Sequence, residues 1–120
     1  MAQNFKNLNV YREAYALSIE VYREIKDLDR HWRLKDQLFG STTAVCTNLA
    51  EMAAFENRNQ QRQKVMVCIG ECNETEFWLE FCKDACLIEE DKFGGFMKKL
   101  ERIRMMLFSL KGSIEKNAVR

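Results

Sequence analysis

Residues 93–114 read FGGFMKKLERIRMMLFSLKGSI. Large apolar side chains recur in this segment at alternating intervals of three and four residues, at Phe93, Phe96, Leu100, Ile103, Leu107, Leu110 and Ile114. This spacing places them on one narrow stripe of a single helix, which must pack against other helices. Because the chain contains no proline, nothing forbids long uninterrupted helices. We therefore predict an all-α fold, an antiparallel up-and-down four-helix bundle.

The length and composition indicate one domain that spans residues 1–120, with 47% hydrophobic residues. Nineteen basic and eighteen acidic residues leave a net charge of +1, so no global field attracts nucleic acid or a membrane. The N-terminal residues lack the apolar run of a signal peptide, and no segment approaches the roughly 18 apolar residues of a membrane span. We expect a cytoplasmic protein without a membrane partner.

Hydrophobic periodicity predicts four helices. They cover about residues 8–27, 33–55, 59–86 and 92–116, with Asn59 as the N-cap of the third. Short connections favour antiparallel neighbours. The third helix carries a slim stripe, Val65, Cys68, Cys72, Thr75, Leu79, Cys82 and Cys86, which suits the bulky stripe of the fourth. We expect these two helices to pair tightly.

Several aromatic residues fall outside the predicted core. Tyr11 and Tyr15 lie beside the apolar face of the first helix, and Phe77, Trp78 and Phe81 lie off the stripe of the third. This is more aromatic surface than one bundle of 120 residues readily buries, and such patches usually mark a subunit contact. We predict a homo-oligomer with these five residues at its contacts.

The cysteines raise the alternative of a metal or redox protein. Cys68 and Cys72 repeat as Cys82 and Cys86 fourteen residues later, which separates the two pairs by roughly 21 Å along a helix, too far for one zinc site. Buried core thiols are the favoured interpretation, because free cysteine packs as a small hydrophobe. We predict no metal and no cofactor.

No constellation of catalytic residues stands out. The di-iron motif Glu-x-x-His is absent, since Leu28 precedes the only histidine, His31, at that spacing. No serine or threonine has a partner that would activate it. We predict that the protein is not an enzyme and takes no small-molecule substrate.

Basic residues concentrate near the C-terminus, and Lys98, Lys99 and Arg102 form the densest cluster. One interpretation is a solvated outer face that the acidic third helix partly neutralises. The other is a strip that contacts the phosphates of a nucleic acid.

Four short motifs carry a resemblance to a known family. They are Asn4-Phe5-Lys6-Asn7-Leu8 with Val10-Tyr11, then Leu34-Lys35-Asp36-Gln37, then Asn48-Leu49-Ala50-Glu51, and finally Gly70 with Glu74. In this order and spacing, the chain resembles the four-helix-bundle proteins encoded by intervening sequences inside bacterial 23S ribosomal RNA genes. Where members usually show an arginine pair, this chain has Phe39-Gly40.

The resemblance implies an up-and-down bundle assembled as a homopentamer, without enzyme activity. Distant relatives are accessory proteins of diversity-generating retroelements, in which a basic pentamer engages reverse transcriptase and nucleic acid. The motif residues Asn48 and Glu51 lie one helical turn apart, so we interpret them as a structural polar network that fixes helix register.

Two functional hypotheses follow. The first is a non-catalytic homo-oligomer that associates with structured RNA or a nucleoprotein through the basic face. The alternative is a protein-binding adaptor that uses an exposed aromatic patch and has no nucleic-acid role.

Overall fold

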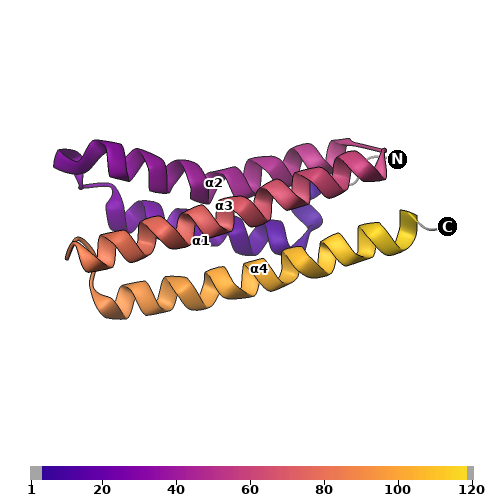
Figure 1. The fold of residues 1–120 in the computed structure, drawn as a ribbon. Coiled ribbons are helices and arrows are strands. Elements are labelled where there is room, and N and C mark those ends of the chain that lie inside the picture. Colours follow the sequence, from indigo (N-terminus) through magenta and orange to yellow (C-terminus); the bar gives the residue numbers. More distant parts are fainter. Residues whose placement is uncertain (1–3, 119–120) are drawn as a thin grey trace.

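The computed structural model describes residues 4–118, which form four long helices in a rod of 50 × 21 × 20 Å (Figure 1). The helices are α1 (Asn9–Ile25), α2 (Trp32–Ala54), α3 (Arg58–Asp84) and α4 (Glu90–Ala118). Short 3₁₀ turns, Phe5–Asn7 and Asp29–His31, precede α1 and α2. Residues 4–118 contain no strand. The predicted all-α four-helix bundle is confirmed.

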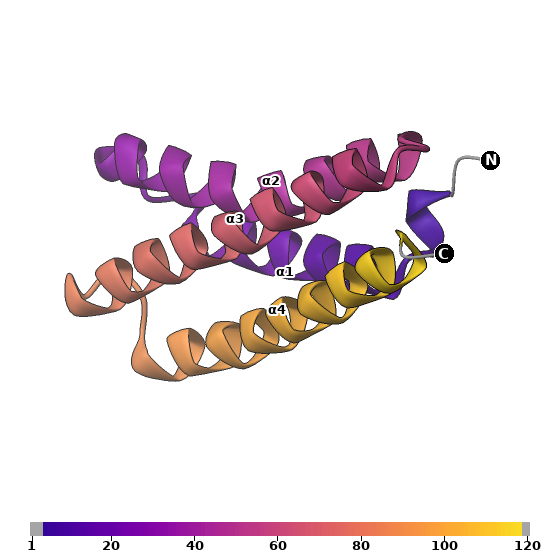
Figure 2. The ribbon, with the colours of Figure 1, turned by 45° about the vertical axis from the view of Figure 1, so that its right-hand side comes forward.

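The helices run alternately up and down the rod, and each packs against two neighbours (Figure 2). Helix α1 contacts α2 and α4, and α3 contacts the same two helices from the other side. As a result, α1 and α3 lie at diagonal corners of the bundle. The surface that each presents to solvent therefore faces a different direction.

The two complementary stripes pack as the spacing predicts. Six of the seven residues on the stripe of α3 are buried, as are five of the seven on α4, where Phe93 and Leu110 are half-buried. Thr75, Cys68 and Cys72 are fully enclosed, and Thr75 and Cys68 also reach α2, at Ser41 and at the Val45 carbonyl. The core is therefore continuous along the rod.

The prediction that Cys86 continues the buried stripe of the third helix was wrong. Helix α3 ends at Asp84, and Cys86 follows in the turn with a φ of 62° and an exposed side chain. The Leu87 amide donates back to the Cys82 carbonyl at 2.8 Å and closes the helix. A left-handed residue after the last turn is the usual way to end a helix, so the chain leaves the stripe before position 86.

The start of α3 also differs from the prediction. Asn57, not Asn59, is the N-cap, and its side chain accepts a hydrogen bond from the Gln60 amide at 3.1 Å. Two asparagines two residues apart offer the same chemistry, and the extended backbone at Asn57 selects the first. The pair Gly94-Gly95 lies inside α4 without interrupting it.

Hydroxyl groups in the interior bond to one another or to helix carbonyls. The Thr75 and Ser41 hydroxyl oxygens lie 2.9 Å apart and join α3 to α2. The Ser18 hydroxyl donates to the Ala14 carbonyl at 2.9 Å and lies 3.3 Å from the Thr42 carbonyl of α2. No buried polar side-chain atom within residues 4–118 lacks a partner, so these groups specify helix pairing at little cost.

A search of the described residues finds no helix whose length and apolar character would let it cross a membrane.

Candidate functional site

An apolar groove runs along the outside of the bundle between α1 and α2. Its volume is about 540 Å³. Aromatic side chains form much of its wall, and we call it the α1–α2 groove; its lining residues are Tyr11, Tyr15, Ser18, Ile19, Tyr22, Phe39, Thr43, Cys46 and Thr47. The groove is a continuous apolar surface that no part of residues 4–118 covers.

Both tyrosines predicted at an oligomer contact lie in this groove. The rings of Tyr11 and Tyr15 stack with centroids 6.0 Å apart. Tyr15 is exposed, whereas Tyr11 is half-buried against the core. Burial, then the nearby Cys46 and Tyr15, raises the pKa of the Tyr11 hydroxyl. The Tyr11 phenol therefore stays neutral, and both rings present an apolar body with a polar tip, a common composition for protein contacts.

In the far half of the groove, Phe39 was not identified from the sequence. Tyr22 and Phe39 meet edge to face with centroids 5.7 Å apart, and Trp32 stands beside them, exposed, with the Arg33 guanidinium 5.4 Å from its ring centre. The available signal for an exposed contact residue was that Phe39, a large apolar residue, lies off the buried stripe of α2. The predicted up-and-down order makes α1 and α2 neighbours, but the sequence pattern did not specify which outward-facing rings of the two helices meet.

A second aromatic cluster lies on the outer surface of α3. Ring centroids are 4.9 Å apart for Phe77 and Trp78, 6.0 Å for Trp78 and Phe81, and 6.4 Å for Phe77 and Phe81. Phe77 and Phe81 are exposed. Trp78 is half-buried and packs against the core, so it supports the two phenylalanines more than it faces solvent.

The apolar surface of α3 continues toward its N-terminus through Met66, Val67 and Gly70. We call the exposed residues Met66, Val67, Gly70, Phe77 and Phe81 the α3 ridge. Acidic side chains lie among and beside these residues, namely Glu74, Glu80 and Asp84, all of them exposed. The ridge thus combines exposed apolar side chains with negative charge.

The three predicted nucleic-acid contacts lie close together. Lys98, Lys99 and Arg102 line one hollow of about 430 Å³ between α4 and α1. Two of them meet glutamates of α1: the Lys99 ammonium lies 2.5 Å from Glu20, and the Arg102 guanidinium lies 2.8 Å from Glu13. Within residues 4–118, Lys98 is exposed and makes no ion pair. The hollow is therefore positively charged but partly neutralised.

The residues of the predicted polar network lie at the α2–α3 contact, joined by a residue that sequence reasoning did not select. The Lys64 ammonium of α3 donates to Glu51 at 2.9 Å and lies 3.4 Å from the Asn48 side-chain oxygen. The Asn48 amide also donates to the Ala44 carbonyl at 2.8 Å. Lys64 thus connects two turns of α2 to α3.

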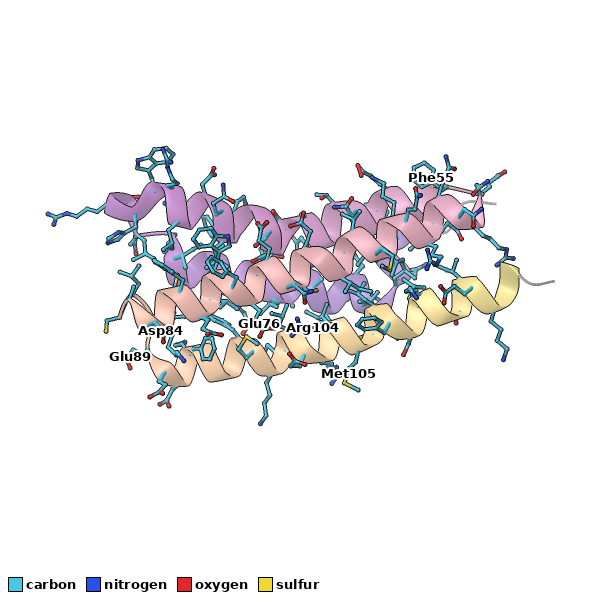
Figure 3. All side chains as sticks on the ribbon, viewed as in Figure 1. Phe55, Glu76, Asp84, Glu89, Arg104 and Met105 are labelled. Atoms are coloured by element: carbon cyan, nitrogen blue, oxygen red, sulfur yellow. The ribbon has the colours of Figure 1, made fainter. Side chains whose placement is uncertain are left out.

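A second polar connection joins α3 to α4. Arg104 is only 15% exposed and donates to Asn73 and Glu76 at 2.6 Å each, and also to Glu101 (Figure 3). Burial acts to lower the pKa of Arg104, but hydrogen bonds to the two glutamates outweigh it and raise that pKa. The guanidinium stays charged, and the contact acts as a structural clamp. Met105, the next residue, points away from α3 (Figure 3).

No group of three histidine, cysteine, aspartate or glutamate side chains in the described part of the chain is arranged to hold a metal ion. Burial raises the thiol pKa to about 12 for Cys68 and Cys72 and to about 11 for Cys82. These thiols are protonated at neutral pH and unreactive, because the thiolate is the nucleophile and the metal ligand.

Comparison with known proteins gives a family and a fold. A family profile described as 23S rRNA-intervening sequence protein matches residues 6–109. A crystal structure from Bacteroides thetaiotaomicron, described as a protein with unknown function from the S23 ribosomal protein family, superimposes with a TM-score of 0.80. The two chains are 20% identical, and the match covers 86% of this chain and 95% of that one. No curated protein sequence matches this chain.

Proposed function

Since the chain belongs to the family of 23S rRNA-intervening sequence proteins, we propose that it acts as a non-catalytic, homo-oligomeric bundle that associates with structured RNA or with a nucleoprotein. The observation that carries the RNA part is the hollow between α1 and α4. It presents Lys98, Lys99 and Arg102, which lie within five residues of one another on α4, on one surface.

The glutamates in this hollow do not prevent phosphate binding. Both ion pairs lie at the surface, with side-chain exposures of 40–71%. Exposed pairs of this kind contribute about 0–1 kcal/mol, so a phosphate replaces a carboxylate at small cost. An oligomer repeats the hollow once per subunit, which converts a weak contact into a multivalent one. The pentamer that the family resemblance implies presents five copies.

The oligomer itself is supported by the α1–α2 groove and the α3 ridge. Both are apolar surfaces that remain open in a single subunit, and large open apolar surfaces mark protein contacts. The proposal places the assembly in the cytoplasm, where an odd number of cysteines, five, none of them in a disulfide, is normal.

Crosslinking in cells followed by sequencing of the bound RNA tests the proposal. We expect enriched structured RNA with the unmodified protein and a loss of enrichment with the triple variant Lys98→Gln, Lys99→Gln and Arg102→Gln. The matched control removes three exposed cations elsewhere, by Lys92→Gln, Lys116→Gln and Arg58→Gln. Absence of RNA from the unmodified protein, or equal losses in both triple variants, would overturn the role of the hollow.

A second candidate function is an adaptor that binds a partner polypeptide without nucleic acid, and the α1–α2 groove favours it. Salt distinguishes the two. RNA binding weakens steeply as the salt concentration rises. For each duplex phosphate that the protein neutralises, the logarithm of the association constant falls by about 0.9 per unit of log salt concentration. An apolar protein contact lacks this steep dependence.

A further inference from the structure

The α1–α2 groove and the α3 ridge are both open apolar surfaces. The groove is an apolar channel between two helices, and the ridge is a row of exposed apolar side chains on one helix, whose Phe77 and Phe81 also line a hollow of about 480 Å³ together with acidic side chains. A single helix laid into the channel between two others is the arrangement that already builds the core of this bundle. Gly70 gives the ridge a low point, since a Cβ built there meets no atom within 4 Å.

The charges at the borders of the two surfaces are complementary. At 100° per residue, the exposed residues Arg12, Arg23 and Lys26 share the stripe of α1 that borders the groove beside Tyr15 and Ile19. The acids of this helix that face α4, Glu13 and Glu20, are already engaged by α4. On the α2 side, Asp36 and Arg33 add mixed charge.

The ridge carries the opposite sign. Glu74 and Glu80 make no ion pair within residues 4–118. Asp84 has only the neighbouring Lys83, 3.5 Å away. Burial, followed by the nearby Glu74, raises the pKa of Glu71 on the same helix. Opposite charges at the edge of an apolar contact fix its register and exclude wrong partners.

One subunit cannot join its own groove to its own ridge. The groove lies beside α1, and the ridge lies on α3 at the diagonal corner. We infer that the α3 ridge of one subunit occupies the α1–α2 groove of a second copy of the chain, so that subunits join head to tail. Such a contact leaves one groove and one ridge free at the ends of any open chain, and it is completed only when the subunits close into a ring. The inference rests on the proposed homo-oligomer and specifies which surfaces build it.

Two single variants test this arrangement. Tyr15→Asp places a charge in the groove, and Phe81→Asp places one on the ridge. These residues are 53% and 48% exposed, so the substitutions leave the core intact. Phe108→Asp is the matched control, because Phe108 is 54% exposed and lies on α4, outside both surfaces. Circular dichroism verifies helix content for all three, and native mass spectrometry gives the oligomer masses.

We expect the unmodified protein and Phe108→Asp to form the same oligomer, and each of the other two variants alone to be monomeric. Mixed in equal amounts, the groove variant contributes its intact ridge and the ridge variant its intact groove. The mixture then forms a 1:1 heterodimer with twice the mass of the 14.2 kDa chain, and nothing larger.

Two results would overturn the inference while leaving the proposed oligomer standing. A mixture that stays monomeric, beside an oligomeric unmodified protein, would mean that groove and ridge do not meet. A homodimer of either variant alone would mean that one surface pairs with its own copy. A monomeric unmodified protein would contradict the proposed oligomer as well, and would leave the groove to another polypeptide.

Discussion

Ser41 and Thr75 form a hydrogen bond between α2 and α3 inside a largely apolar core, with their hydroxyl oxygens 2.9 Å apart. Both side chains are almost fully buried. Thr75 also bonds to the Glu71 carbonyl and Ser41 to the Leu38 carbonyl, at 2.8 and 3.2 Å. Each hydroxyl therefore retains a partner within its own helix if the other is removed.

This arrangement predicts a modest cost for Thr75→Val. The substitution keeps the shape and removes the hydroxyl, so we expect the free energy of unfolding to fall by about 1 kcal/mol. Urea unfolding followed by circular dichroism measures it. Thr43→Val is the control, because that hydroxyl bonds within its own helix near the surface. A loss as large for Thr43 as for Thr75 would contradict an interhelical contribution.

Replacing Arg104 should lower the free energy of unfolding more than replacing Thr75 does. Replacement by methionine removes hydrogen bonds to Asn73, Glu76 and Glu101 and leaves two carboxylates without their cation. Because Glu76 is more than a third exposed, solvent screening limits the loss of unfolding free energy to about 1–2 kcal/mol. Arg104→Lys should recover little of it, since an ammonium cannot reproduce the planar fork. Full recovery in thermal unfolding would mean that only the charge matters.

The cysteines should differ sharply in reactivity. Cys86 is the one exposed thiol in residues 4–118, and the other four are buried. We expect Ellman's reagent at pH 8 to modify one thiol quickly and five after unfolding. Cys86→Ser should abolish the fast reaction. Rapid modification of a second thiol in the folded protein would show that the core opens on the timescale of the assay.

The same thiols predict a loss of stability at alkaline pH. In the folded state the pKa is about 12 for Cys68 and Cys72 and about 11 for Cys82, against a reference of 9.0. The unfolded chain therefore releases these protons first as pH rises. The resulting stability is fully present below about pH 9 and decreases between pH 9 and 12. Urea unfolding midpoints measured between pH 9 and 12 should fall less steeply with pH in a Cys72→Ala variant than in the unmodified protein.

Gly70 predicts a gain in stability. It lies in the interior of α3, where glycine costs about 0.5–1 kcal/mol relative to alanine, and a Cβ there meets nothing within 4 Å. In the Tyr15→Asp background, which we expect to be monomeric, Gly70→Ala should raise the free energy of unfolding by that amount. Gly112→Ala, equally open, is the comparison. A decrease for Gly70 alone would reveal a constraint inside the subunit.

RNA affinity should increase when the glutamates of the basic hollow are neutralised. Glu13→Gln and Glu20→Gln release Arg102 and Lys99 from their ion pairs and remove two charges that repel phosphate. Since each exposed ion pair contributes about 0.3–1 kcal/mol, we expect the RNA affinity to rise roughly two- to fivefold for each substitution. Fluorescence anisotropy with a structured RNA measures it, and Glu89→Gln at the distant α3–α4 turn is the control. Unchanged affinity would place RNA elsewhere.

Most of the fold was predictable from the sequence, because alternating intervals of three and four residues define which side chains are buried. The stripes of α3 and α4 pack as predicted, and the family resemblance found in four motifs is confirmed by the match over residues 6–109. The exception, Cys86, continues the spacing beyond the helix, and periodicity alone does not report where a helix ends.

The surfaces were less predictable. Glu13 and Glu20 pair with cations about eighty to ninety residues away, and sequence spacing within one helix cannot identify such partners. Phe39 and Tyr22 form half of the groove only because α1 lies next to α2. Lys64 joins Asn48 and Glu51 from a different helix. Each of these relationships depends on which outward-facing side chains of neighbouring helices meet, and the hydrophobic pattern leaves that open.

The alternating direction of the helices has an electrical consequence. Helices α2 and α4 begin at the end of the rod where α1 and α3 finish. Each helix carries a macrodipole equivalent to about half a unit charge at either terminus, positive at the start and negative at the finish. Two of each sign meet at both ends and largely cancel. The backbone therefore gives neither tip of the molecule a preference for anions, and attraction of a polyanion depends on side chains along its length.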